Sequence, residues 1–409
     1  MSVDAGSAGL SPALKRSWAL AALLASLVML GPFSIDLYLP AFGAIGRELA
    51  APPVAVQATL SAYLFAYAFM MLWHGALSDA LGRRPVVIAG LIVYAVATLL
   101  CAIAGNIQSL WLARALQGLS AGTGLVVGRA IIRDSFHGPE AQKAMSQITL
   151  VFSIAPAVAP VIGGVLLNTM GWRSMFWALL AFTLVVLAWA WRALPETHPP
   201  RLRSELHPRT QWRNYLAVIG KPEFLLLAFI PALNFCAFFL YIAGAPAFLV
   251  DLLGVSTWGF GWLFIPLIAG VMIGATASGR LAGKLSSRRT VRAGYTFMGV
   301  AAAINILVCL FATPHVALMV APISVYMIGS ALVQPSITVM LLDLFPTMRG
   351  LASSLQGFIQ FALGGIVAGT IAPLVDHSLV LFAAGMAAFT AVSWILWVIY
   401  ARRTRVITP

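Results

Sequence analysis

"GALSDALGRRP", residues 75–85, is a short polar stretch between two long apolar runs. Asp79 and Arg83 place opposite charges four residues apart within it. The flanking runs, about 54–77 and 85–104, are each long enough to cross a bilayer as a helix. The stretch therefore predicts a tight, charged loop between two membrane helices.

The whole chain repeats this apolar pattern. Of its 409 residues, 61% are hydrophobic and only 9% are charged, and the mean hydropathy is +0.94. A soluble protein would need far more charge to cover its surface, and barrel strands would alternate apolar and polar residues. The sequence predicts an all-α membrane protein with spans at about 18–40, 54–77, 85–104, 107–131, 142–167, 172–193, 223–248, 257–279, 290–312, 315–341, 350–373 and 379–401.

The net charge of +13 is distributed unevenly between the two sides of the predicted bundle. The side with the N-terminus holds Lys15, Arg16, Arg83, Arg84, Arg133, Lys143, the basic residues of 192–221, Arg280, Lys284, Arg288, Arg289, Arg292, Arg349, Arg402, Arg403 and Arg405. The other side holds only Arg47 and Arg173. This asymmetry predicts cytoplasmic N- and C-termini. Since topology accounts for the positive charge, no nucleic-acid partner is expected.

The chain also divides into two similar halves. Residues 1–193 and 222–409 each hold six predicted spans, and the Pro-, Arg- and His-rich segment 194–221 reads as a cytoplasmic linker. "GALSDALGRR" after span two has a counterpart in "GRLAGKLSSRR" after span eight, about two hundred residues later. Two six-helix bundles related in this way predict a transporter with its substrate site between them.

One acid, Asp36, lies inside the first predicted span. Intramembrane acids are costly and tend to face a cavity, and burial favours the protonated form. Asp36 is therefore a candidate to bind either a proton or a cationic substrate. Alternatively, because a helix from Trp18 to Asp36 would rise about 27 Å, Asp36 could be simply solvated at the outer mouth.

Two arginines lie well inside spans, Arg114 and Arg129. Arg114 shares a helix face with Gln117. It could stabilise charged Asp36, or polarise a nearby site so that protonation changes the contact between helices one and four. A structural pairing or snorkelling to the outer surface is the alternative for Arg114, and structural pairing is expected for Arg129.

A lipophilic or cationic small molecule would favour aromatic and polar cavity walls. Such residues share helix faces in several spans. The candidates for substrate binding are Tyr38, Tyr63, Tyr67, Gln117, Asn234, Phe238, Tyr241, Gln356 and Gln360.

Several motifs resemble those of the major facilitator superfamily. Residues 75–85 are similar to the signature loop between helices two and three, and "LARALQG" (112–118) is similar to the helix-four motif of proton-coupled members. The resemblance implies that the loop and its neighbours form a conformational gate, a cytoplasmic charge cluster that also involves the start of helix eleven and locks the outward-facing state. The implied gate residues are Gly75, Asp79, Gly82, Arg83, Arg84 and Asp134.

"APAVAPVIGG" (155–164) resembles the helix-five motif of exporters, with Ala159 where that motif usually has glycine. Its motif residues are Pro156, Pro160, Gly163 and Gly164. "SIDLYLPAF" (34–42), "RDSF" (133–136) and "DLFPTMRGLASSLQGF" (343–358) resemble drug:H+ antiporters of the bicyclomycin-resistance/CflA type. The resemblance implies proton-coupled efflux of drugs or small metabolites across a bacterial inner membrane.

Other functions remain as alternatives. A symporter importing a metabolite could use Asp36 in the same way, and a non-transporting sensor would leave the intramembrane charges unexplained. "GLSAG" (118–122) matches a hydrolase pattern but lies in an apolar helix, so no enzyme is expected. The sequence shows no nucleotide or metal motif. We expect a monomer in membrane lipid that uses a proton gradient, with no cofactor and no metal.

Overall fold

The computed structural model describes residues 12–136, 138–203, 207–281 and 284–404. Within them, twelve helical segments are long and apolar enough to cross a membrane. The predicted all-α fold is confirmed. The chain ends, 1–11 and 405–409, which the charge pattern predicts to be cytoplasmic, lie outside the described residues.

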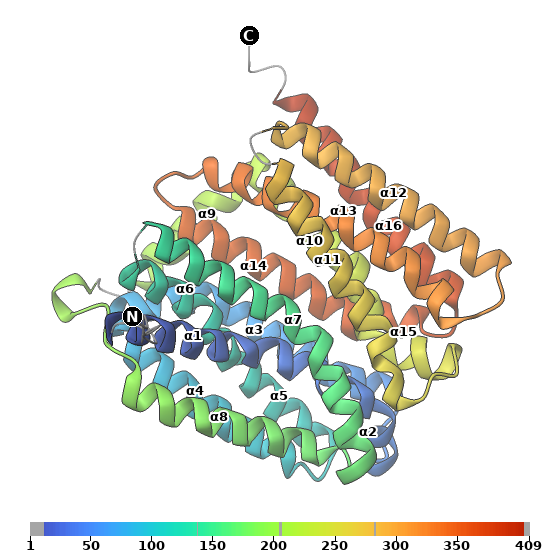
Figure 1. Ribbon diagram of the computed structural model, residues 1–409, viewed down its shortest axis with the longest axis horizontal. Coiled ribbons are helices and arrows are strands. Elements are labelled where there is room, and N and C mark those ends of the chain that lie inside the picture. The colour runs from blue at the N-terminus through green and yellow to red at the C-terminus, as the bar shows by residue number, and fades with distance from the viewer. Residues whose placement is uncertain (1–11, 137, 204–206, 282–283, 405–409) are drawn as a thin grey trace, which may run out of the picture.

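The first six spans follow the predicted order (Figure 1). They are α1 (Pro12–Asp36) with η1 (Leu39–Ala41) and α2 (Phe42–Glu48), α3 (Pro53–Leu81), α4 (Arg83–Ala102), α5 (Ile107–Ala121) with α6 (Thr123–Ser135), α7 (Gly138–Met170) and α8 (Arg173–Ala193). Two details differ from expectation. The first helix ends at Asp36 before short helical turns continue it, and the fourth span is divided at Gly122.

The segment predicted as a linker contains η2 (Pro200–Leu202) and α9 (Pro208–Ile219). The second six spans are α10 (Pro222–Ala243), with η3 (Pro246–Leu252) after it, η4 (Thr257–Phe260) with α11 (Gly261–Leu281), α12 (Ser287–Phe311), α13 (Val316–Asp343), α14 (Arg349–Ile366) with η5 (Val367–Ile371) and α15 (Ala372–Val375), and α16 (Leu379–Arg403). The division at 193 and 222 stays a prediction.

The two halves repeat one packing scheme. In the first half α3 and α4 pack on α5, α4 on α8 and α1 on α7, and in the second half α11 and α12 pack on α13, α12 on α16 and α10 on α14. These are the same pairs of positions counted from the start of each half. The sequence repeat is thus matched by a structural repeat.

The halves meet along α3 and α14 and along α7 and α11 (Figure 1). Gly365 lies against the ring of Phe65, and Gly369 lies against Ser61. Near the end of α7, Asn168 Nδ2 donates to Thr257 Oγ1 at 3.0 Å. These contacts join the halves toward one end of the bundle. We call that end the glutamate end, because Glu48 lies there. The opposite end, where α3 meets α4 at Arg83, is the side that the sequence predicts to carry most of the arginines, and we call it the arginine-rich end.

Small residues allow the helices to approach closely, which matters because lipid supplies no hydrophobic force between helices. In α11, Gly270 and Gly274 lie directly on the backbone of α13, and a Cβ at Gly274 would overlap the Ile328 carbonyl. Gly279, farther along the same helix, has nothing within 4 Å of a Cβ position.

We expect Gly274→Ala to lower the free energy of unfolding by about 1–3 kcal/mol, because α11 and α13 must separate to admit the methyl group. Gly279→Ala should leave stability unchanged or slightly higher, since alanine favours helix. Thermal unfolding of the two purified variants provides the comparison, and equal midpoints would contradict the close packing of α11 on α13.

Candidate functional site

Two cavities lie between the halves. A central pocket of about 320 Å³ contains residues of both halves, and a larger cavity of about 730 Å³ lies at the arginine-rich end. The aromatic wall of the central pocket consists of Tyr67, Phe152, Phe235, Phe238, Phe239, Phe264 and Phe361. Its polar side chains are Asp36, Ser330, Gln334 and Gln360. The pocket therefore suits a flat apolar ligand with few polar groups.

Asp36 is the acid of this pocket. It is the last residue of α1, its exposed fraction is 3%, and it lines the pocket beside Gly31 and Pro32. Its carboxyl group makes no ion pair or hydrogen bond with any described residue. The alternative that Asp36 is simply solvated at the outer mouth does not fit this burial. A buried acid without a partner can bind a proton or a cationic group that enters the pocket.

Arg114 lies in the interior of the first half and is fully buried. Its Nη2 donates to the Ser34 carbonyl at 2.8 Å, its Nη1 donates to Gln117 Oε1, and its guanidinium lies 4.3 Å from the ring centre of Tyr38 and 4.5 Å from that of Tyr63. No acid pairs with Arg114 among the described residues. An ion pair with Asp36, one of the two roles considered for Arg114, is absent from this conformation. The hydrogen bond to the Ser34 carbonyl instead connects α5, the first part of the fourth span, to α1 at a position two residues before Asp36.

Three of the predicted substrate-binding residues, Tyr67, Phe238 and Gln360, line the central pocket. The other six face elsewhere. Tyr38, Tyr63 and Gln117 surround Arg114, Asn234 donates to Tyr295, Tyr241 accepts from Asn305, and Gln356 donates to Thr338. These six side chains therefore make their contacts within one half of the chain and not toward the pocket.

Sequence reasoning missed most of the aromatic wall. Phe361 contacts Tyr67 across the two halves, with ring centres 4.7 Å apart, and Phe235 at 5.8 Å. Nothing in an apolar run distinguishes a pocket phenylalanine from a lipid-facing one. Gln334 had a usable signal, because it is a polar residue inside an apolar span, Val316–Asp343.

A buried histidine also escaped notice. His74 of α3 is 3% exposed, its Nε2 lies 2.9 Å from Thr123 Oγ1, and its Nδ1 lacks a partner. It occupies the break between α5 and α6, since a Cβ at Gly122 would lie 3.2 Å from His74 Nδ1. The missing side chain of Gly122 therefore makes room for the imidazole.

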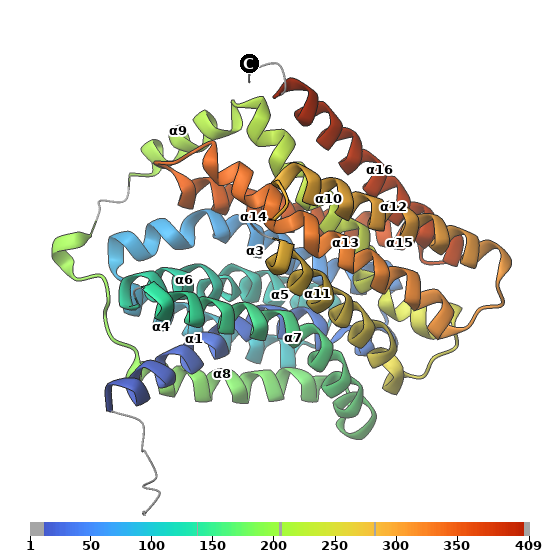
Figure 2. The same cartoon turned by 45° about the horizontal axis from the view of Figure 1, so that its top comes forward.

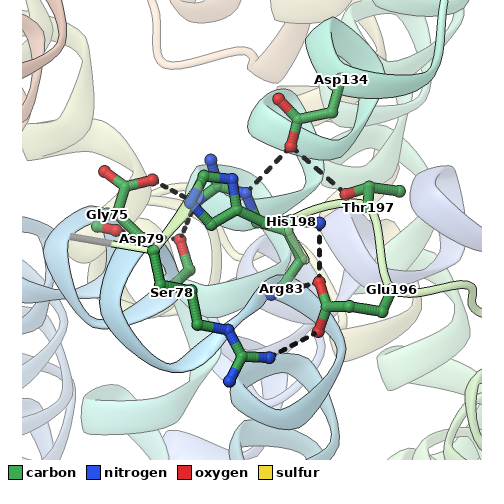
Figure 3. Close-up of polar contacts among 9 residues, drawn as sticks. Gly75, Ser78, Asp79, Arg83, Asp134, Glu196, Thr197 and His198 are labelled. Carbon is green, nitrogen blue, oxygen red and sulfur yellow. Dashed lines mark hydrogen bonds and ion pairs between the residues drawn. The ribbon is translucent and has the colours of Figure 1, made fainter. Parts of the chain in front are cut away.

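At the arginine-rich end, Arg83 joins three elements (Figure 3). Its Nη1 donates to Ser78 Oγ at 2.6 Å and to Asp79, and its Nε donates to Asp134 Oδ2 at 3.1 Å. Gly75 supplies the carbonyl that accepts from Ser78 Oγ at 2.9 Å. The predicted cluster of Asp79, Arg83 and Asp134 is thus present in the geometry, and it connects α3, α4 and α6.

The cluster extends to the segment after α8 (Figure 3). No ion pair or hydrogen bond joins it to α14, the eleventh span, among the described residues. The Arg83 backbone N–H donates to Glu196 Oε1 at 3.0 Å. Gly82 adopts φ +101°, and any Cβ there would overlap the carboxylate of Glu196. Arg349 at the start of α14 faces Asp343 at 3.5 Å instead. The partners of Arg83 among the described residues, Ser78, Asp79, Asp134 and Glu196, therefore all precede α9.

Arg84 points away from this cluster. Its Nη2 donates to the Trp191 carbonyl of α8 at 2.7 Å. Its contact is structural and joins α4 to α8 near the arginine-rich end.

The exporter-like motif of the fifth span lies on α7. Pro156 lines the central pocket, and Pro160 follows one turn later. Gly163 packs on the Leu37 carbonyl next to Asp36, and Gly164 packs on the Thr257 carbonyl of the second half. This part of α7 therefore lies between the Asp36 region and the opposing half.

Comparisons with known proteins agree with this architecture. The model of the Major Facilitator Superfamily matches residues 24–369. The chain is 29% identical to a bicyclomycin resistance protein homolog of Haemophilus influenzae, over 86% of this chain and 88% of the other, and 32% identical to the MFS-type transporter YdgK of Bacillus subtilis, over 87% and 89%. It is also 29% identical to multidrug resistance protein D of Escherichia coli, over 88% and 90%.

Solved structures show the same fold. The nucleoside transporter NupG has a TM-score of 0.74 at 12% identity, over 95% of this chain and 99% of the other. A D-xylose-proton symporter has a TM-score of 0.70 at 16% identity, over 92% and 97%.

The part of the chain that the structure describes holds twelve helices long enough to span a membrane, arranged in two repeated halves with a pocket between them. With the family match and these relatives, the protein is a multi-pass membrane transporter of small molecules and not an enzyme. The chain belongs to the Major Facilitator Superfamily. Its curated relatives include proteins named for bicyclomycin and multidrug resistance, as the resemblance of the motifs predicts.

Replacing the fork of Arg83 by a single ammonium, in Arg83→Lys, should lower the free energy of unfolding by about 1.5–3 kcal/mol, because at least one charge-assisted hydrogen bond is lost. Arg84→Lys keeps the charge and loses only a bond at an exposed site, so it should change little. Thermal unfolding measures both, and an Arg83→Lys midpoint equal to that of Arg84→Lys would show that the fork geometry is unimportant.

Proposed function

We propose that this transporter exports drugs or small metabolites across the bacterial inner membrane in exchange for protons. The observation that carries the proposal is Asp36, a buried acid without a partner in an aromatic pocket between the two halves. Such an acid can hold a proton or a polar group of the substrate, but not both. Competition for one carboxylate is sufficient to couple outward transport to inward proton movement.

The cycle follows from the two ends of the bundle. With the arginine-rich end in the cytoplasm, as the charge pattern predicts, the 730 Å³ cavity opens inward and the contacts between α7 and η4 close the outer side. A substrate enters from the cytoplasm and binds beside unprotonated Asp36. After the halves rock to open outward, a proton from outside neutralises Asp36 and weakens its hold on the substrate.

Arg114 acts in this scheme as a positioning residue. Its bond to the Ser34 carbonyl and its place between two tyrosine rings fix the turn of α1 that carries Asp36. A proton gained by Asp36 changes the charge next to this turn, and the contact between α1 and α5 transmits the change. Arg114 itself does not reach the pocket wall.

The proposed substrates are lipophilic molecules, neutral or cationic. The seven aromatic rings of the pocket offer stacking and cation–π contacts, and only a few polar groups are available to specify a ligand. The relatives named for bicyclomycin resistance and for multidrug resistance support this class. A proton gradient supplies the energy in this proposal, without a cofactor, and the working unit is a monomer surrounded by lipid.

Proton-coupled uptake is the second candidate, because a solved relative of the same fold is a D-xylose-proton symporter and a buried acid can serve either direction. The exporter-like motif of α7 favours efflux. A sensor without transport is less favoured, since it gives no role to a buried acid in a pocket between the two halves. The direction of proton movement separates these candidates.

We expect Asp36→Asn to abolish uphill substrate movement in proteoliposomes with an imposed pH gradient, while binding of a neutral ligand is retained, because asparagine keeps the shape and cannot exchange a proton. Asp376→Asn, in the loop between α15 and α16, is the matched control and should transport normally. Full uphill transport by Asp36→Asn would remove Asp36 as the coupling site. Proton movement in the same direction as the drug would favour symport.

Phe361 tests the pocket separately from coupling, because it contacts rings of both halves. Phe361→Ala should weaken binding of an aromatic ligand by about 1.5–3 kcal/mol, which is roughly 10- to 150-fold in Kd. Phe311→Ala, at a side chain that is 81% exposed, is the control and should bind normally. Equal affinities measured by calorimetry would place the substrate outside this pocket.

A further inference from the structure

The segment between the two bundles contains a helix, α9, that the transport scheme does not use. One side of α9 is docked on the protein: Tyr215 and Val218 are buried, and Tyr215 Oη donates to the Leu72 carbonyl of α3 at 2.7 Å. Burial raises the pKa of Tyr215 to about 12, so the hydroxyl keeps its proton and remains a donor. The orientation of α9 about its own axis is thereby fixed.

A different face of α9 exposes large apolar side chains. Trp212 is 59% exposed, Leu216 is 51% exposed and Ile219 is 38% exposed. Their spacing of four and three residues places them in one stripe along the helix. We call these three residues the α9 stripe. In water this stripe would be an unfavourable surface, and the described chain packs nothing over it.

Positive charge borders the α9 stripe. Arg209 and Arg213 are exposed, lie one turn apart and adjoin the stripe on the helical wheel. Neither forms an ion pair with a described residue. An apolar stripe with tryptophan, bordered by arginines, is the pattern of a helix that lies in the interface of an anionic bilayer.

The position of α9 agrees with such an interface. α9 begins after α8 leaves the bundle and ends three residues before Pro222, where α10 begins. It contacts α10 and α14 of the second half (Figure 2 shows α9 on the outer side, next to α14). The helix therefore lies at the level where spans start and end, which is where tryptophan and arginine meet lipid headgroups.

We propose that α9 is an interfacial helix whose stripe inserts among acyl chains while Arg209 and Arg213 bind the phosphate groups of anionic phospholipids. The opposite side of the helix contributes Gln211 and Asn214 to the wall of the 730 Å³ cavity. Lipid bound outside thus holds one wall of the cavity through which substrate is proposed to enter. The lipid contact itself does not depend on which substrate is carried or in which direction.

Hydrogen–deuterium exchange of the full chain in nanodiscs tests the proposal. Exchange in peptide 208–219 should be slower in discs containing phosphatidylglycerol than in pure phosphatidylcholine, by roughly fivefold for each arginine that binds a headgroup. Arg209→Gln with Arg213→Gln should remove this lipid-dependent difference. Arg289→Gln with Arg292→Gln is the control, since it removes the same charge from exposed sites of α12 and should preserve the difference.

A second pair of variants separates insertion from charge. Trp212→Ser with Leu216→Ser should speed exchange of α9 in both kinds of disc, while peptides of α12 exchange as in the wild type and report that the fold is intact. Identical exchange of wild-type α9 in the two discs would overturn the headgroup site. Protection of α9 that rises with protein concentration in lipid-free detergent would assign the stripe to a second copy of the chain and overturn the lipid assignment.

Discussion

The cost of placing charge in hydrocarbon is the constraint on which the rest of this structure depends. The chain meets it in three ways. Arg83 is surrounded by carboxylates at one end of the bundle, Arg114 is buried against tyrosine rings and a backbone carbonyl, and Asp36 lines a pocket between the halves. Only the third arrangement leaves a titratable group able to meet a ligand, and for this reason the proposed chemistry centres on Asp36.

Close helix packing places that acid near the surface where the two halves meet. Gly163 brings α7 onto the backbone beside Asp36, and Gly164 brings the same helix onto η4 of the other half. In the proposed cycle, a change of charge at Asp36 would therefore occur next to the contact between the two halves. The same helix contributes Pro156 to the pocket, so one short stretch of α7 contacts the pocket, the backbone beside Asp36 and the opposing half.

The charge cluster around Arg83 has a different task. Its partners Asp79, Asp134 and Glu196 all precede α9, so it stiffens the first half and holds the chain that leaves α8. The resemblance to known gates implied a contact with helix eleven, but here Arg349 faces Asp343. The cavity of about 730 Å³ separates Asp79 and Arg83 from the start of α14. In this conformation, Asp79 and Arg83 are therefore not in contact with α14, the eleventh span.

The sequence by itself determined the class of the protein, its twelve spans and its two repeated halves, because hydrocarbon requires long apolar helices and these leave a plain record in composition and period. It also marked Asp36, Arg114 and the Arg83 loop, since charge is rare in such a chain. Only the tertiary structure decided which polar residues face the pocket. Tyr67 and Gln360 do, whereas Tyr38, Tyr63 and Tyr241 satisfy partners inside a half. The wall of the pocket consists of phenylalanines whose environment depends on the rotation and contact of helices far apart in sequence, and no local pattern encodes that arrangement.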